Sequence, residues 1–263
     1  MRSHFRHLFL QLTALDAPIV ALIWQEMAAH FCGNTPQWEE RLILFCSVWG
    51  IYLADRVWDV TRLPDARLPA FRHRFARRHR NIFAAGAALN FMVAFLLAYT
   101  RLTRELIAAG SILAILCGVY LWWRHAMPKW RISLPMRAGC IGSIFAAGVV
   151  LTAWMHSPHP INGLLFWIPL TLLFSANVLH AEAIESRFAG EVHGQKGFSS
   201  AIAAALIAAA LLPITRDYTP VAGLILAALG TAVFAYYQER FTPDTAAALA
   251  DAILIVPGAL LLL

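Results

Sequence analysis

The stretch IFAAGAALNFMVAFLLAYTRLTRELIAAGSILAILCGVYLWW, from Ile82 to Trp123, decides the fold class. It contains two apolar runs, 82–100 and 105–123, which are separated by a short link that holds Arg101 and Arg104. A helix that crosses a bilayer needs about 20 predominantly apolar residues, so each run is long enough to cross once. The stretch therefore predicts two consecutive transmembrane helices.

The same apolar character extends over the whole chain of 263 residues, of which 60% are hydrophobic and 14% charged. A soluble domain is typically about 45–50% apolar and about 25% charged, so lipid is the solvent that this composition fits. We expect an all-α polytopic membrane bundle that forms a single domain over residues 1–263. Its nine expected spans are 8–29, 41–59, 82–100, 105–123, 134–155, 163–181, 198–213, 219–237 and 244–263.

The basic residues predict the orientation of the bundle. With nine spans, 17 of the 21 Lys and Arg residues fall on one face of the membrane, and only Arg41, Arg101, Arg104 and Arg216 fall on the other. Cytoplasmic loops carry the excess of Lys and Arg, so we expect the N-terminus inside and the C-terminus outside a bacterial-type inner membrane. The net charge of +6 thus reflects topology and does not indicate a nucleic-acid partner.

A first polar constellation, YLADRVWD, lies at the expected cytoplasmic end of span 41–59. Its residues Tyr52, Asp55 and Asp59 are spaced i, i+3, i+7 and share one helical face. Two carboxylates at i, i+4 can hold Mg²⁺, which prefers oxygen ligands and keeps substrate phosphates in its coordination shell. The alternative is that both aspartates pair with Arg56, Arg62 or headgroup water.

A second constellation, NVLHAEAIESRFAGEVHGQKG, follows span 163–181 on the same face of the membrane. Glu182 and Glu185 can face the same way, and Glu191 comes after a turn with a glycine. Taken alone, this is a solvated acidic helix end. Together with the first constellation, it can clamp two metal ions on a diphosphate. His180 and Asn177 share one face of the same helix and either line a substrate pocket or make a hydrogen bond between helices.

A third constellation, YLWWRHAMPKWRISLP, joins spans 105–123 and 134–155. Its basic residues Arg124, Lys129 and Arg131 can hold the oxygens of a leaving diphosphate. The alternative is ordinary anchoring at the membrane boundary by positive charges and interfacial tryptophans.

The chain resembles the UbiA superfamily of membrane prenyltransferases, which have nine transmembrane helices and two Asp-rich motifs at the cytoplasmic mouth. The stretch LDAPIVALIW, from Leu15 to Trp24, is similar to the family's Asp-Lys-Pro-Ile start of its first helix, with Ala17 in place of the lysine. The family's NDxxDxxxD motif is kept at Asp55, Arg56 and Asp59, whereas Ile51 and Tyr52 replace its leading Asn-Asp pair.

Two further motifs extend the resemblance over nearly the whole chain. The family's Tyr…Lys-Arg…Gly pattern is similar to Tyr120, Lys129, Arg131 and Gly139. Its second Asp-rich motif, which precedes a Gly-Lys segment, corresponds to an all-glutamate version before Gly194 and Lys196. These glutamates are Glu182, Glu185 and Glu191.

The resemblance implies Mg²⁺-dependent transfer of a prenyl group from a prenyl diphosphate to an aromatic or other lipid-soluble acceptor. Asp55 and Asp59 would bind one Mg²⁺ and Glu182 and Glu185 a second, with Glu191 nearby. The diphosphate would be held by Arg56, Lys129 and Arg131, and the substrate pocket lined by Tyr52, Tyr120, Asn177 and His180.

A second hypothesis belongs to another class, because the altered motifs also fit a catalytically inactive UbiA-like protein that binds a lipid or a partner. A small transporter is less favoured, since the chain has no inverted repeat and few charges at the expected midplane. A CDP-alcohol phosphotransferase is disfavoured because its DGxxAR…GxxxDxxxD pattern is absent.

Overall fold

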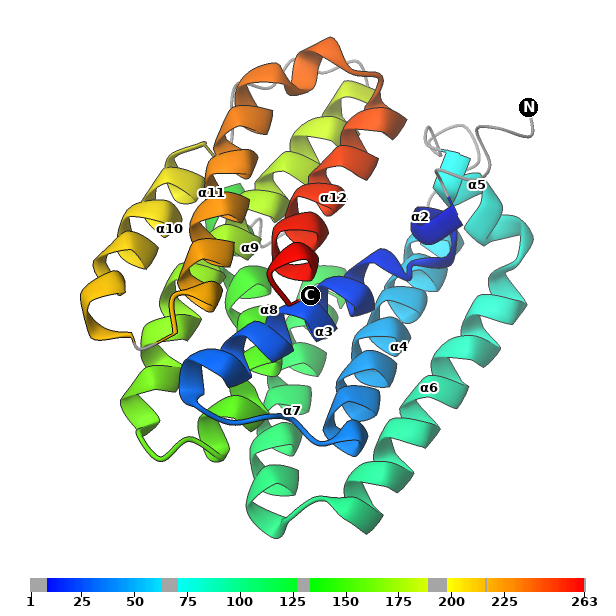
Figure 1. Ribbon diagram of the computed structural model, residues 1–263. Coiled ribbons are helices and arrows are strands. Elements are labelled where there is room, and N and C mark those ends of the chain that lie inside the picture. The colour runs from blue at the N-terminus through cyan, green and yellow to red at the C-terminus, as the bar shows by residue number, and fades with distance from the viewer. Residues whose placement is uncertain (1–8, 63–70, 127–132, 189–197, 216, 263) are drawn as a thin grey trace.

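The computed structural model describes residues 9–62, 71–126, 133–188, 198–215 and 217–262, and every regular element within these ranges is a helix (Figure 1). The helices are α2 (Phe9–Thr13), α3 (Asp16–Cys32), α4 (Trp38–Arg62), α5 (Phe71–Arg78), α6 (Arg80–Arg101), α7 (Arg104–Ala126), α8 (Leu134–Met155), α9 (Pro160–Phe188), α10 (Phe198–Ala210), α11 (Thr219–Tyr237) and α12 (Pro243–Leu262). Two short 3₁₀ turns, η2 (Leu212–Ile214) and η3 (Gln238–Arg240), follow α10 and α11.

Six of these helices, α6, α7, α8, α9, α11 and α12, are long and apolar enough to cross a membrane. This finding indicates an integral membrane protein and agrees with the expected polytopic all-α class. Helices α3 and α10 are shorter, with 17 and 13 residues, and α4 carries charged residues toward both of its ends. The count of nine crossings therefore stays a prediction.

The expected first span, 8–29, is not one helix, because the chain turns at Ala14 between α2 and α3. Ala14 adopts a left-handed backbone conformation with φ 55°. Its N–H donates to the Gln11 carbonyl and the Leu15 N–H donates to the Leu10 carbonyl, which is the Schellman pattern of a helix end. Trp49 of α4 donates its indole N–H to the Thr13 carbonyl over 2.9 Å and fixes this turn against the bundle.

Helix α3 lies in the middle of the bundle and packs against α4, α8, α9, α11 and α12 (Figure 1). Trp24 and Met27 of α3 are fully buried beside Phe166 of α9. Helices α8 and α9 approach each other closely, because a Cβ at Gly142 would collide with the side chain and backbone of Ser175. Small residues at helix interfaces allow such close packing in membrane proteins.

Helices α3 and α4 are antiparallel, so the bundle has two distinct ends. The Asp55 end holds the start of α3 and the end of α4. The His30 end holds the end of α3, the start of α4 and the short connection between α6 and α7 (Figure 1). At the periphery, α6 packs on α4 and α7 packs on α8. Their outer faces expose large apolar side chains such as Phe95 and Ile115, as expected of a surface that faces lipid.

Candidate functional site

At the Asp55 end, α4 presents the side chains of the first constellation. Tyr52, Asp55, Arg56 and Asp59 are all half-buried. Tyr52 packs against the central core of α3 and also against the apolar cluster that α4 shares with α5 and α6. Because α4 is continuous from Trp38 to Arg62, the predicted i, i+3, i+7 spacing does place these side chains along one helix.

Two carboxylates from other helices join this group. Asp16 of α3 and Asp251 of α12 both act electrostatically on the Tyr52 hydroxyl, as do Asp55 and Arg56 of α4. Three helices therefore bring acidic side chains toward one phenolic oxygen.

Long-range hydrogen bonds hold the three helices in this arrangement. The Gln11 amide of α2 donates to Asp251 Oδ2 over 3.2 Å, and the Trp24 indole of α3 donates to the Leu254 carbonyl of α12 over 3.2 Å. The second bond lies within the apolar core, where Trp24 is fully buried. The position of Asp251 is thus tied to both α2 and α3.

Asp16 is unusual among these groups. Its Oδ1 atom is buried and accepts no hydrogen bond from any residue that the structure describes. Asp16 lies in the first turn of α3, where the positive end of the helix dipole favours a carboxylate. The helix therefore tolerates this charge, while the free oxygen leaves an acceptor available within the bundle.

Helix α7 also lies near this group of polar side chains. Asp55 acts electrostatically on the Cys117 thiol of α7, so this carboxylate lies toward α7. Tyr120 comes one helical turn after Cys117 and is buried, with 8% of its surface exposed. The predicted pocket residue Tyr120 thus lies on the same face of α7 as Cys117, the thiol on which Asp55 acts.

The second acidic constellation contains an ion pair between helices. Glu182 of α9 pairs with Arg137 of α8, and both side chains are about a quarter exposed. From the sequence, Arg137 was expected only as one of the 17 basic residues on the positive face of the membrane. The pairing gives Glu182 a structural role that does not require a metal ion.

His180 lies on the face of α9 that contacts α11. Its Nδ1 is 3.3 Å from Gln238 Oε1, and its fully buried ring meets Phe234 edge-on at 5.5 Å. This contact matches the hydrogen bond between helices that was one of the two roles considered for His180. Asn177, one turn earlier, is half-buried.

Several predicted residues fall outside the described part of the chain. They are Lys129, Arg131 and Glu191, together with the side chains of Arg124 and Glu185. Among the described residues, no group of three or more His, Cys, Asp or Glu side chains is arranged to hold a metal ion. The Asp55 and Asp59 pair still fits Mg²⁺ in chemistry, because this ion usually takes one or two carboxylates and fills its other positions with water and phosphate oxygens.

Asp16, Asp251 and Arg137 were not among the site residues predicted from the sequence. Asp251 had a usable signal, since it is a lone acid inside the apolar stretch ALADAILIV, and an intramembrane acid is a functional candidate by default. Asp16 stood within the stretch that resembles the family's first helix. Arg137 offered no signal, because a cation at a helix start on the positive face looks like ordinary anchoring.

Comparisons of the chain with protein-family models, curated proteins and solved structures found no match. The assignment of a function therefore depends on the residues themselves.

Proposed function

We propose that the protein is an intramembrane prenyltransferase of the UbiA type, which moves an isoprenoid group from a prenyl diphosphate to an aromatic or other lipid-soluble acceptor. The observation that carries this proposal is the convergence of carboxylates from α3, α4 and α12 around Tyr52 at the Asp55 end. Acidic side chains within the helices of a membrane bundle are functional candidates by default. Because Arg56 lies in the same group, the group offers both carboxylates for a metal ion and a guanidinium for a diphosphate.

The chain's own residues have distinct tasks in this reaction. Asp55 and Asp59 would hold Mg²⁺, which would supply positive charge for the departing diphosphate. Arg56, with Lys129 and Arg131, holds diphosphate oxygens by charge-assisted hydrogen bonds. The allylic C–O bond breaks, and the acceptor forms a bond to the same carbon and loses a proton to a carboxylate or water. Tyr52 and Tyr120 exclude water from the electron-poor carbon.

The decisive test compares Asp55→Asn with the matched control Glu105→Gln. Glu105 is exposed at the start of α7, at the His30 end of the bundle. Purified full-length protein is given Mg²⁺, a panel of isoprenoid diphosphates and a panel of aromatic and quinone-type acceptors, and diphosphate release is measured. We expect Asp55→Asn to reduce the rate by about 100-fold or more, since one electrostatic contact to a developing charge contributes about that factor. Glu105→Gln should have no effect.

One observation favours a second function, an inactive relative that binds a lipid or a partner without catalysis. The Glu182–Arg137 pair occupies one of the carboxylates that a second metal ion would need. This second function would be favoured over the enzyme if no donor gave diphosphate release and no donor bound in a Mg²⁺-dependent way.

The prenyltransferase proposal includes nine crossings, a cytoplasmic N-terminus and an outer C-terminus in a bacterial-type inner membrane. The 17-to-4 division of basic residues supports it, because the Asp55 end is then cytoplasmic and accessible to a diphosphate. Reporter fusions after Gly33 and Leu263 should both be active outside, and a fusion after Arg67 should be active inside. A cytoplasmic signal from Leu263 would exclude nine crossings.

A further inference from the structure

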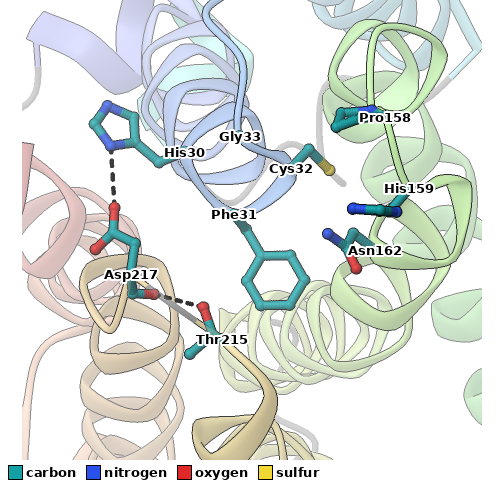
Figure 2. A pocket seen from close by; sticks show the side chains of 9 residues that line it. All are labelled: His30, Phe31, Cys32, Gly33, Pro158, His159, Asn162, Thr215 and Asp217. Carbon is teal, nitrogen blue, oxygen red and sulfur yellow. Dashed lines mark hydrogen bonds and ion pairs between the residues drawn. The ribbon is translucent and has the colours of Figure 1, made fainter.

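A second polar site lies at the His30 end, away from the proposed prenyl-transfer site. A cavity of about 440 Å³ opens between the end of α3, the start of α9 and the link that leads into α11 (Figure 2). This volume is in the range of small-molecule sites. The Phe31 ring reaches into the cavity from α3, while polar side chains face it from two opposite sides (Figure 2).

One wall of the cavity carries a fixed carboxylate, that of Asp217. Its Oδ2 lies 3.4 Å from His30 Nδ1, and its Oδ1 accepts the Thr219 backbone N–H over 2.9 Å. The Thr215 hydroxyl donates to the Asp217 carbonyl over 2.7 Å and holds the backbone of the link. Partial burial raises the pKa of this carboxyl, but the hydrogen bonds from Thr219 and His30 outweigh it and hold the pKa below its usual value. Asp217 is therefore an anion at neutral pH.

The opposite wall is built to donate hydrogen bonds. His159 and Asn162 project toward the cavity from the beginning of α9 (Figure 2). Their backbones form a fixed turn, in which the His159 carbonyl accepts the Asn162 N–H and the Ser157 hydroxyl, both over 2.9 Å. Because Pro160 has no N–H and the Asn162 N–H is taken by the His159 carbonyl, the donors that this wall offers are the Asn162 side-chain amide and a ring nitrogen of His159. The positive end of the α9 dipole lies beside them. This wall suits an anion.

The position of the cavity supplies the third constraint. It lies where the membrane-spanning helices α9 and α11 begin, which is the depth of phospholipid headgroups. We propose that the cavity binds the phosphoethanolamine headgroup of a membrane phospholipid, with the ammonium on Asp217 and the phosphodiester on His159, Asn162 and the start of α9. The acyl chains then continue down the apolar outer surface of the bundle.

The test measures lipid binding to purified full-length protein in detergent by native mass spectrometry. The probes are phosphatidylethanolamine, phosphatidylcholine, which has no N–H donors, and phosphatidylglycerol, which has no ammonium. We expect phosphatidylethanolamine to bind at least fivefold more tightly than the other two. Asp217→Asn should remove this preference, because it keeps an acceptor for Thr219 but loses the charge. Equal binding of the three lipids by the unaltered protein would overturn the proposal.

Asn162→Leu tests the phosphate wall. It should weaken the binding of all three lipids by a similar factor. Gln37 is exposed at the same end of the bundle but lies outside the cavity, so the matched control Gln37→Leu should leave the binding of all three unchanged. His159→Ala replaces Asn162→Leu if the latter lowers the melting temperature in lipid-free detergent. The headgroup could come from a membrane lipid or from a soluble molecule, and soluble glycerophosphoethanolamine distinguishes the two. If it binds as tightly as phosphatidylethanolamine, the ligand is a free phosphodiester and the proposal of a membrane phospholipid is overturned.

Discussion

The two ends of the helical bundle treat their charges in opposite ways. At the His30 end, three ion pairs each join different parts of the chain: Glu26 with Arg41, Glu40 with His156 and His30 with Asp217. At the Asp55 end, Asp16, Asp55 and Asp251 act on a single hydroxyl, that of Tyr52. Charges at the first end connect α3, α4, α8 and the start of α11. At the second end, Glu182 pairs with Arg137, but carboxylates from three helices also lie near Tyr52 together with Arg56.

The pairs Glu26–Arg41 and Glu40–His156 hold the fold, whereas the carboxylates at the Asp55 end serve the ligand of the proposed reaction. An ion pair between helices stabilises their packing and is lost at a cost when either partner is removed. Carboxylates that lie near one another repel and are costly to desolvate, so their arrangement depends on nearby cations and hydrogen-bond donors, such as Arg56 and the Gln11 amide at this end. Proteins commonly retain such unfavourable groups only where function needs them. Substitutions at the His30 end should therefore lower stability and spare activity, whereas substitutions at the Asp55 end should spare stability and lower activity.

The largest effect on stability is expected at Glu40, which is 3% exposed. Its Oε1 lies 2.7 Å from His156 Nε2, and its Oε2 accepts the Gln37 backbone N–H over 2.9 Å at the start of α4. Glu40→Ala removes a helix cap and a contact between helices, which are worth about 1 kcal/mol each, and leaves a void. We expect a loss of about 2–3 kcal/mol, measured by denaturant titration in detergent.

Glu40→Gln is the matched control, because it keeps the length of the side chain and an oxygen for the Gln37 amide. It should lose less than half as much stability as Glu40→Ala. Diphosphate release at 20 °C should stay unchanged in Glu40→Gln. A strong loss of activity without a loss of stability would mean that charges at the His30 end are not merely structural.

The opposite result is expected for Asp16→Asn at the Asp55 end. Since Asp16 Oδ1 accepts no hydrogen bond from the described residues, the substitution breaks no bond at that atom. Loss of the favourable helix-dipole interaction costs only about 0.3–1 kcal/mol. We expect a nearly unchanged melting temperature and at least a tenfold lower rate of diphosphate release. A large drop in melting temperature with full activity would make Asp16 a structural residue.

The sequence predicted the helical class well but missed one helix boundary for a specific reason. Two Schellman turns end α2 and α3, the first at Ala14 and the second at Gly33, with φ 55° and 74°. Gly33 is the usual residue for a left-handed cap, so the end of α3 is visible in the sequence. Ala14 is an unusual residue for that conformation, and tertiary contacts such as the Trp49 bond stabilise it. A local pattern therefore could not place this break.

The candidate site was predictable where it depends on spacing within one helix and not where it depends on contacts between helices. Asp55 and Asp59 follow from the periodicity of α4. Glu182 was identified as an acid at a helix end, but its pairing with Arg137 needs the packing of α8 against α9. The approach of Asp251 to Tyr52 joins residues that are about 200 positions apart, and no local pattern in one sequence encodes such a contact.

The smallest predicted effect concerns the pH dependence of the His30–Asp217 pair, whose side chains are 43% and 42% exposed. A carboxyl whose pKa is lowered in the folded protein stabilises it above the unfolded pKa, which is about 3.9 for Asp. This contribution disappears as the pH falls through the lower, folded pKa. Because both side chains are exposed to solvent, this contribution to the free energy of unfolding is limited to about 0.5 kcal/mol, the usual scale of solvent-exposed pairs.

Asp217→Asn isolates that contribution, because asparagine keeps an acceptor for the Thr219 amide and loses only the ionisable group. The unaltered protein should therefore melt slightly above the variant at pH 7, and the two melting temperatures should converge as the pH falls through the lowered, folded pKa of Asp217 and its carboxyl loses its charge. The measurement is thermal unfolding in detergent at several pH values and at low salt, where screening is weakest. A difference that stays constant down to pH 3 would show that the shape or hydrogen bonding of the side chain, and not its charge, stabilises this end of the bundle.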